Sequence, residues 1–280
     1  MQRFLRPTLL LALLGLASAG LVRQDVQDPE AVLGAFRDAG LELDLERGVC
    51  AVPVTVQVRD DLLEFLLTDV HGSSHEALLT TEVQPSVLNA ALLVLGVEQG
   101  TNAQWMQKNP PPTEEERREG QSLLEVVPPQ GDGFYLYLAW REGDETHFYR
   151  VEDLLRNLAT GRSMRRHRWV YLGSRMLPSR DEGGAELFAA DVERNHINLA
   201  LLSQGTTLVT AALPESQWQA IWLPNAWLLP ERGTGLHLYF SRERLSVPPP
   251  SLAGKLPQAP LQEAPTAGAG GNSGQAGPPK

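Results

Sequence analysis

Two histidines and a glutamate fall within one short stretch, as His71, His75 and Glu76. Imidazole nitrogens and carboxylate oxygens are common zinc ligands, so these residues make a metal-dependent hydrolase one hypothesis. The intervening Gly72-Ser73-Ser74 argues against a helix, and on a strand His75 and Glu76 would point to opposite sides. The spacing also differs from the helical HExxH arrangement. The competing interpretation is a histidine hydrogen-bonded at the start of a strand, with Glu76 in solvent and no cofactor.

A second candidate site is the basic cluster formed by Arg162, Arg165, Arg166 and Arg168 with His167. In an acidic chain such a cluster predicts contact with an anion or an acidic ligand, through Arg165, Arg166 and Arg168. The alternative is a solvated stretch after the C-terminus of a helix, where cations lie favourably. The sequence contains no phosphate-binding loop of the GxxxxGK[ST] or GxGxxG type and no GxSxG nucleophile elbow.

The tryptophans offer a further candidate surface. Trp140, Trp169, Trp218, Trp222 and Trp227 either line a ligand groove or pack in the core, and core packing is the commoner role. Because Trp218 and Trp222 are close in sequence, an exposed patch there would indicate a surface for a partner.

The first 19 residues have the pattern of a secretory signal peptide. Arg3 and Arg6 precede a short apolar run, and small residues follow it, so we expect cleavage after Ala19. The apolar run is shorter than the roughly 20 residues that a membrane-spanning helix needs. We therefore expect a periplasmic or secreted protein with no transmembrane span after cleavage, with retention of the segment as an anchor left open. Cys50 is the only cysteine, so it cannot form an internal disulfide, and its apolar neighbours predict a buried thiol.

The charge of the chain limits its partners. A formal net charge of −10 disfavours nucleic acid and anionic lipid surfaces, which both require an electropositive face. At the other end, residues 248–280 are rich in Pro, Gly and Ala and contain no aromatic residue. Such a segment cannot bury enough apolar surface to offset its ordering entropy, so we predict a disordered tail.

Periodicity predicts the fold class between these ends. Residues 20–40 read as a helical lead-in, with a helix over 29–39 that ends at Gly40. Across 41–247 strands outnumber helices, and short turns join most neighbours, which favours antiparallel pairing. We therefore expect one α+β domain over 41–247, built on a mostly antiparallel sheet with a few short helices.

Two features interrupt or repeat within this domain. Residues 109–120 combine three prolines with a charge run, which predicts a polar insertion loop. Residues 128–138 and 229–240 share a proline turn, a glycine and an alternating aromatic strand. The repetition either reflects a common local way for a chain to pass from a turn into a strand, or it indicates that the domain consists of two related halves.

Several segments of the domain together carry a family resemblance. They are residues 52–53, 62–66, 75–79, 85–96, 169–175, 189–191 and 229–234. In this combination, over roughly Leu41 to Ser241, the chain resembles the YdjY-domain family. It departs from the family at Ser74, where a charged residue is expected, and in the longer, more acidic loop 109–120.

The resemblance implies an exported bacterial domain but no established activity. We therefore expect a non-catalytic binding or interaction module of the envelope, whose partner is an envelope protein or ligand. The alternative is the metal-dependent hydrolase that would use His71, His75 and Glu76 with zinc.

Overall fold

The computed structural model describes residues 29–179 and 184–260, so the predicted signal segment, residues 1–19, lies outside the described chain. Within the described ranges, no helix has the length and apolar character that crossing a bilayer requires. Helix α1 (Pro29–Asp38) corresponds to the helix expected in the lead-in. Gly40 follows it with a φ of 85°, a left-handed conformation that glycine adopts without strain.

Eight strands close into a barrel in which each strand pairs with the next and the last returns to the first. The ring closes where Thr55 and Val56 pair with Thr80 and Leu79. In order around the barrel the strands are β2 (Val49–Val56), β16 (Gly235–Ser241), β7 (Gly133–Glu142), β10 (Trp169–Tyr171), β14 (Val209–Thr210), β13 (Asn195–Asn198), β3 (Phe65–Asp69) and β4 (Ala77–Thr81).

The predicted α+β class is therefore wrong, because the protein is predominantly β and its sheet is closed. The barrel is also mixed: β13 pairs with β14 in parallel, and β3 pairs with β4 in parallel. The N-terminal strands β3, β4 and β2 are neighbours in the ring, and the last barrel strand of the sequence, β16, lies between β2 and β7. The two similar segments form neighbouring strands, β7 and β16, in which Tyr137 lies opposite Tyr239.

Side-chain alternation along the strands fills the barrel. In β2, Cys50 and Val52 belong to the main core, whereas Val49 and Ala51 belong to a second cluster on the outer face. Cys50 is fully buried, which confirms the prediction for it, and burial raises the pKa of its thiol. Each fully buried large apolar side chain of this core contributes about 1.5–3 kcal/mol.

Three further strands lie beside the barrel strands: β1 (Glu42–Asp44) pairs with β2, and both β8 (Glu145–Arg150) and β17 (Gln258–Ala259) pair with β7. Helix α5 (Pro250–Ala253) precedes β17, and Leu252 and Leu256 pack against the outer cluster. The predicted disorder of residues 248–280 therefore fails for 248–260. Two buried leucines and a strand pairing anchor that part, and residues 261–280 lie outside the described chain.

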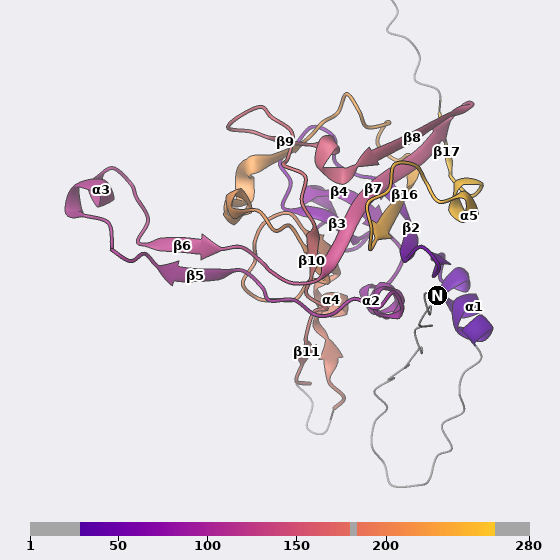
Figure 1. Ribbon diagram of the computed structural model, residues 1–280, viewed down its shortest axis with the longest axis horizontal. Coiled ribbons are helices and arrows are strands. Elements are labelled where there is room, and N and C mark those ends of the chain that lie inside the picture. The colour runs from indigo at the N-terminus through magenta and orange to yellow at the C-terminus, as the bar shows by residue number, and fades with distance from the viewer. Residues whose placement is uncertain (1–28, 180–183, 261–280) are drawn as a thin grey trace, which may run out of the picture.

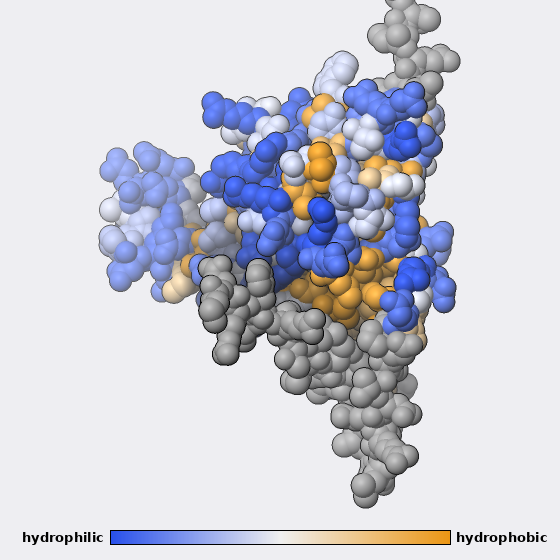
Figure 2. Space-filling model, turned by 45° about the vertical axis from the view of Figure 1, so that its right-hand side comes forward, coloured by the Kyte–Doolittle hydropathy of each residue, from blue (hydrophilic) through white to orange (hydrophobic). Residues whose placement is uncertain are grey.

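A two-stranded arm projects from the barrel (left in Figure 1). Its strands are β5 (Gln104–Gln107) and β6 (Leu124–Val127). At its end lies α3 (Glu114–Arg118), so the predicted polar loop 109–120 contains a short exposed helix. Thr113 caps this helix, because its hydroxyl accepts from the Glu116 N–H and its own N–H donates to the Glu116 carboxylate. The tip of the arm is hydrophilic, whereas apolar side chains show on the body (Figure 2).

Short elements connect the barrel strands. The remaining helices are α2 (Pro85–Val94) and α4 (Ala189–Glu193), and the 3₁₀ turns are η1 (Ser74–Glu76), η2 (Val151–Leu154), η3 (Pro214–Gln217) and η4 (Gln219–Ile221). Two small sheets pair β9 (Leu155–Asn157) with β15 (Trp222–Pro224) and β11 (Met176–Leu177) with β12 (Leu187–Phe188).

Candidate functional site

The predicted metal ligands lie on an exposed turn between β3 and β4. The His75 Nε2 and Glu76 Oε1 atoms are 3.2 Å apart, and the His75 side chain is 76% exposed. His71 is also exposed, and its backbone N–H donates to the Asp69 carboxylate. Across residues 29–179 and 184–260, no three His, Cys, Asp or Glu side chains gather where they could share a metal ion. At this turn, His75 and Glu76 therefore make a two-residue contact on the surface.

The predicted basic cluster is divided by its ion pairs. Arg165 makes a bidentate pair with Glu215 on η3, at 2.8 and 2.6 Å, and its side chain lies on the surface. Arg166 makes a similar pair with Asp153 on η2. Arg168 turns toward the barrel and pairs with Asp132 at 2.6 Å.

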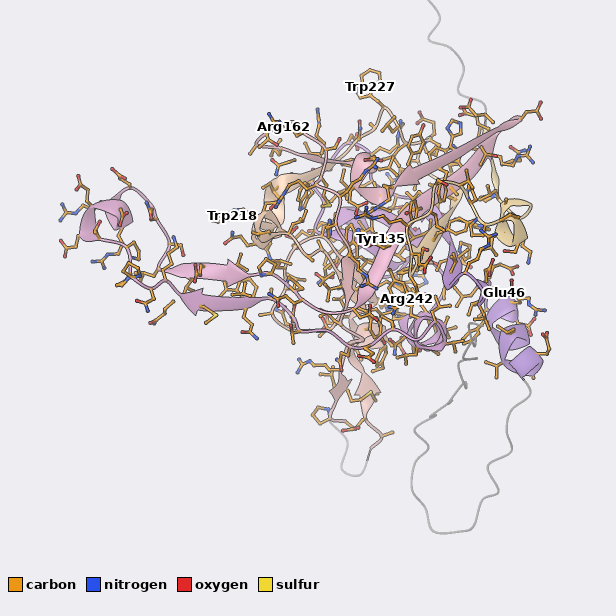
Figure 3. All side chains as sticks on the ribbon, viewed as in Figure 1. Glu46, Tyr135, Arg162, Trp218, Trp227 and Arg242 are labelled. Atoms are coloured by element: carbon orange, nitrogen blue, oxygen red, sulfur yellow. The ribbon has the colours of Figure 1, made fainter. Side chains whose placement is uncertain are left out.

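Arg166 and Arg168 nevertheless line the same pocket, which we call the arginine–tyrosine pocket. It has a volume of about 340 Å³, and Arg165 is not among its lining residues. Its other basic and aromatic walls come from distant parts of the sequence: Arg150, Arg244, Tyr135 and Tyr137. Tyr135, labelled in Figure 3, lies on β7 near the middle of the molecule.

Strand order explains why these residues meet. Along one edge of β7, Phe134 pairs with β10 and Tyr137 pairs with the last residue of β8, Arg150. The chain leaves β8 through η2 and later enters β10 after Arg168. Both η2 and the segment before β10 therefore lie near the place where β8 and β10 meet on the same edge of β7. Tyr135 and Tyr137 point to the outer face, because Phe134 and Leu136 point into the barrel.

A buried ion pair forms the floor of the pocket. Glu152 is completely buried, and its carboxylate accepts hydrogen bonds from the Arg150 guanidinium through both oxygens. The same carboxylate accepts from the Trp169 indole N–H and the His167 backbone N–H, both at 3.2 Å. The Arg150 guanidinium also donates to the His167 carbonyl oxygen and lies 5.2 Å from the Tyr135 ring centroid. Arg150 is thus fixed by hydrogen bonds on one side and by a cation–π contact on the other.

Asp132 holds two arginines at the edge of the pocket. Its two carboxylate oxygens lie 2.6 Å from Arg168 and 2.6 Å from Arg242, which is labelled in Figure 3. Burial raises the pKa of Asp132, but hydrogen bonds from Arg242 and from two backbone N–H groups outweigh it, so the pKa is lowered overall. The adjacent Gly133 is required here, because a Cβ would lie 1.8 Å from the Trp169 carbonyl oxygen. This close approach brings β10, and with it Arg168, against β7.

Among the described pocket residues, His167 and Arg244 have side chains that can still form a hydrogen bond or an ion pair with a ligand. The His167 Nδ1 lies 3.0 Å from the Arg165 carbonyl oxygen, which suits an Nδ1–H donor, and its Nε2 has no partner among the described residues. Burial lowers the pKa of His167 more than the nearby Glu152 carboxylate raises it. The Arg244 guanidinium lies over the Tyr135 ring at 5.5 Å, and no acidic side chain in the described ranges pairs with it.

The charges around the pocket do not cancel. Three carboxylates pair with arginines here, and the arginines number five when Arg242 and Arg244 are included, which leaves two excess positive charges. Glu243 adds an exposed carboxylate close in sequence, but its described hydrogen bonds involve its backbone. In a chain of net charge −10, this local excess makes the pocket a place where an anion is favoured.

Sequence reasoning found part of this site. It singled out Arg166 and Arg168, but it missed Arg150, Arg244 and the two tyrosines, which no local pattern links to the cluster. Comparisons of the chain with family models, with curated proteins and with solved structures give no match.

Proposed function

We propose that this protein is a binding module that takes a small anionic ligand in the arginine–tyrosine pocket. The observation that carries the proposal is the excess of two positive charges around a pocket of about 340 Å³. Arginine is suited to this role because its planar guanidinium pairs with carboxylates and phosphates through two hydrogen bonds.

The pocket is prepared for a ligand before one binds. Arg150, Arg166 and Arg168 are already held by carboxylates, so they lose little side-chain freedom when an anion arrives. The Arg244 guanidinium is the cation that can still form hydrogen bonds with a ligand, and its contact with the Tyr135 ring holds it in place. The expected export from the cytosol, the resemblance to the YdjY-domain family and an envelope ligand agree with a binding role and stay predictions.

Calorimetric titration of the full chain with inorganic phosphate and with citrate tests the proposal. We expect at least one of them to bind in a salt-sensitive way, and Arg244→Gln to weaken that binding about tenfold, the loss of one charge-assisted hydrogen bond. Arg232→Gln is the matched control, because Arg232 is exposed and does not line the pocket. Absence of binding at about 10 mM of either anion, or equal weakening by both variants, would overturn the proposal.

A further inference from the structure

A second hollow lies where the arm leaves the barrel, and its lining differs in chemistry from the arginine–tyrosine pocket. We call it the tryptophan–glutamine groove, and its volume is about 420 Å³. Its walls come from β5, from the loop after β13 and from the junction of η3 and η4; they include Trp105, Trp218, Ser203, Gln204, Gln217 and Gln219. Figure 3 shows Trp218 on the body beside the inner end of the arm.

Hydrogen bonds at the groove join the base of the arm to the body and two segments of the body to each other. The Asn102 side-chain amide donates to the Leu202 carbonyl oxygen at 2.8 Å, and the Leu201 N–H donates to the Ser216 carbonyl oxygen at 2.9 Å. The walls are therefore fixed relative to one another. The two indoles remain accessible, with Trp105 38% and Trp218 60% exposed.

A smaller inner hollow of about 190 Å³ lies next to the groove, because Leu202 and Gln204 line both. Two nearly buried polar side chains, Thr68 and Asn195, line the inner hollow from neighbouring positions on β3 and β13. The Thr68 Oγ1 and the Asn195 Oδ1 have no hydrogen-bond partner in the described chain. Buried polar atoms without partners are rare and costly, and both oxygens are shielded from solvent. A ligand hydroxyl would satisfy them once the walls of the inner hollow move apart.

The lining selects against two ligand classes. Among the residues that the structure describes, Glu193 is the one charged residue that lines either hollow, and its negative charge disfavours an anion. An apolar ligand would cover the amides and hydroxyls without giving them partners, which costs free energy for each group. What remains is a ligand that is neutral, rich in hydroxyl groups and able to lay a C–H face on an indole.

We propose that the tryptophan–glutamine groove binds a neutral oligosaccharide. Glutamine amides and the serine hydroxyl both donate and accept, as sugar hydroxyls do, and the exposed indoles provide flat apolar surfaces for sugar rings. The inner hollow takes the end of the chain, whose hydroxyls reach Thr68 and Asn195 when the walls of the hollow move apart. Together the two hollows fall in the range of about 300–1,000 Å³ that is typical of ligand sites.

Calorimetric titration with maltohexaose, cellohexaose and fully N-acetylated chitohexaose, which are all neutral, tests this proposal on the full chain. We expect at least one of them to bind, and Trp218→Ala to weaken the binding about tenfold or more. Trp227→Ala is the matched control, because Trp227 is 93% exposed and projects from the body away from Trp218 (Figure 3). Circular dichroism of each variant establishes that the fold is intact.

The second variant, Thr68→Val, keeps the shape of the side chain and removes the hydroxyl. It should also weaken the oligosaccharide, whereas Arg244→Gln in the arginine–tyrosine pocket should not. Three results would each overturn the inference: no binding of any of the three oligosaccharides at about 10 mM, equal weakening by Trp218→Ala and Trp227→Ala, or tighter binding of hexagalacturonate, an anionic chain.

Discussion

The two hollows differ in how the protein treats their buried polar groups. In the arginine–tyrosine pocket, the Glu152 carboxylate receives hydrogen bonds from Arg150, Trp169 and His167. In the inner hollow beside the tryptophan–glutamine groove, Thr68 and Asn195 keep oxygen atoms without a partner among the described residues. The fold itself thus satisfies the carboxylate at the floor of the first site, although the His167 Nε2 there has no partner among the described residues. The two oxygens of the inner hollow are left to a ligand. Substitutions should therefore act mainly on stability at the floor of the first site and mainly on binding in the second.

The largest effect is expected at the floor of the pocket. Glu152→Gln removes the negative charge beside Arg150, whose side chain is only 10% exposed, and leaves that cation buried without a counterion. We expect the free energy of unfolding to fall by about 3–5 kcal/mol, measured by urea denaturation. The matched control is Glu231→Gln, which breaks the pair with Arg59 although the Glu231 side chain is 70% exposed. That change should cost about 1 kcal/mol or less, and equal losses in the two variants would contradict this account of the pocket.

The next effect is a dependence of stability on pH, and it arises from His196 on β13, the strand that also carries Asn195. Burial lowers the pKa of His196 to about 4, against an ordinary value of 6.5, although a hydrogen bond with the Val83 carbonyl oxygen opposes the shift. Between these values the unfolded chain binds a proton that the folded chain does not. Stability is therefore fully present above pH 6.5 and falls as the pH drops toward 4, by about 3 kcal/mol in all.

Urea denaturation of the wild type and of His196→Gln at several pH values measures this loss. Burial also lowers the pKa values of His167 and His237, so both proteins should lose some stability in acid. The difference between them isolates His196, and the variant should have the shallower slope. His75→Gln is the control, because the His75 side chain is mostly exposed, and it should follow the wild type. Parallel slopes for wild type and His196→Gln would refute the assignment.

Local patterns in the sequence predicted the long strands but not how they close. Alternation over residues 235–241 predicts a strand, and β16 has the same bounds, because alternation over seven residues is a strong signal. Closure depends on pairing of β2 with β4 over Thr55 and Val56, and on strands as short as β10 and β14. Elements of two or three residues show no periodicity, so a closed, mixed barrel could not be distinguished from an open antiparallel sheet.

Tertiary contacts also overrode local propensity near the pocket. Residues 151–158 predict a short helix, but the structure has the single turn η2 followed by strand β9. The turn places Glu152 under Arg150, where the carboxylate receives its hydrogen bonds, and β9 pairs with β15. Sequence reasoning could find the arginines of 165–168 from their density. It could not find Arg150, Tyr135 or Arg244, because strand order alone brings them together.

The smallest expected effect on stability is the most informative about the groove. Thr68 is 1% exposed, yet its hydroxyl has no partner in the described chain, so Thr68→Val removes a polar group that the folded state leaves unsatisfied. We expect the free energy of unfolding to change by less than about 0.5 kcal/mol, or to rise, in urea denaturation. Thr207→Val is the matched control, because the Thr207 hydroxyl lies within hydrogen-bond distance of the carbonyl oxygens of His196 and Val209, at 2.9 and 3.1 Å.

That control should cost about 1–2 kcal/mol, since a made hydrogen bond is lost and carbonyl oxygens are left buried. The two threonines are equally buried and differ in whether the protein satisfies their hydroxyls. If Thr68→Val proved as costly as Thr207→Val, the Thr68 hydroxyl would have a partner inside the fold. It would then offer nothing to a ligand, and the contrast between the satisfied Glu152 carboxylate and the unsatisfied Thr68 hydroxyl would fail.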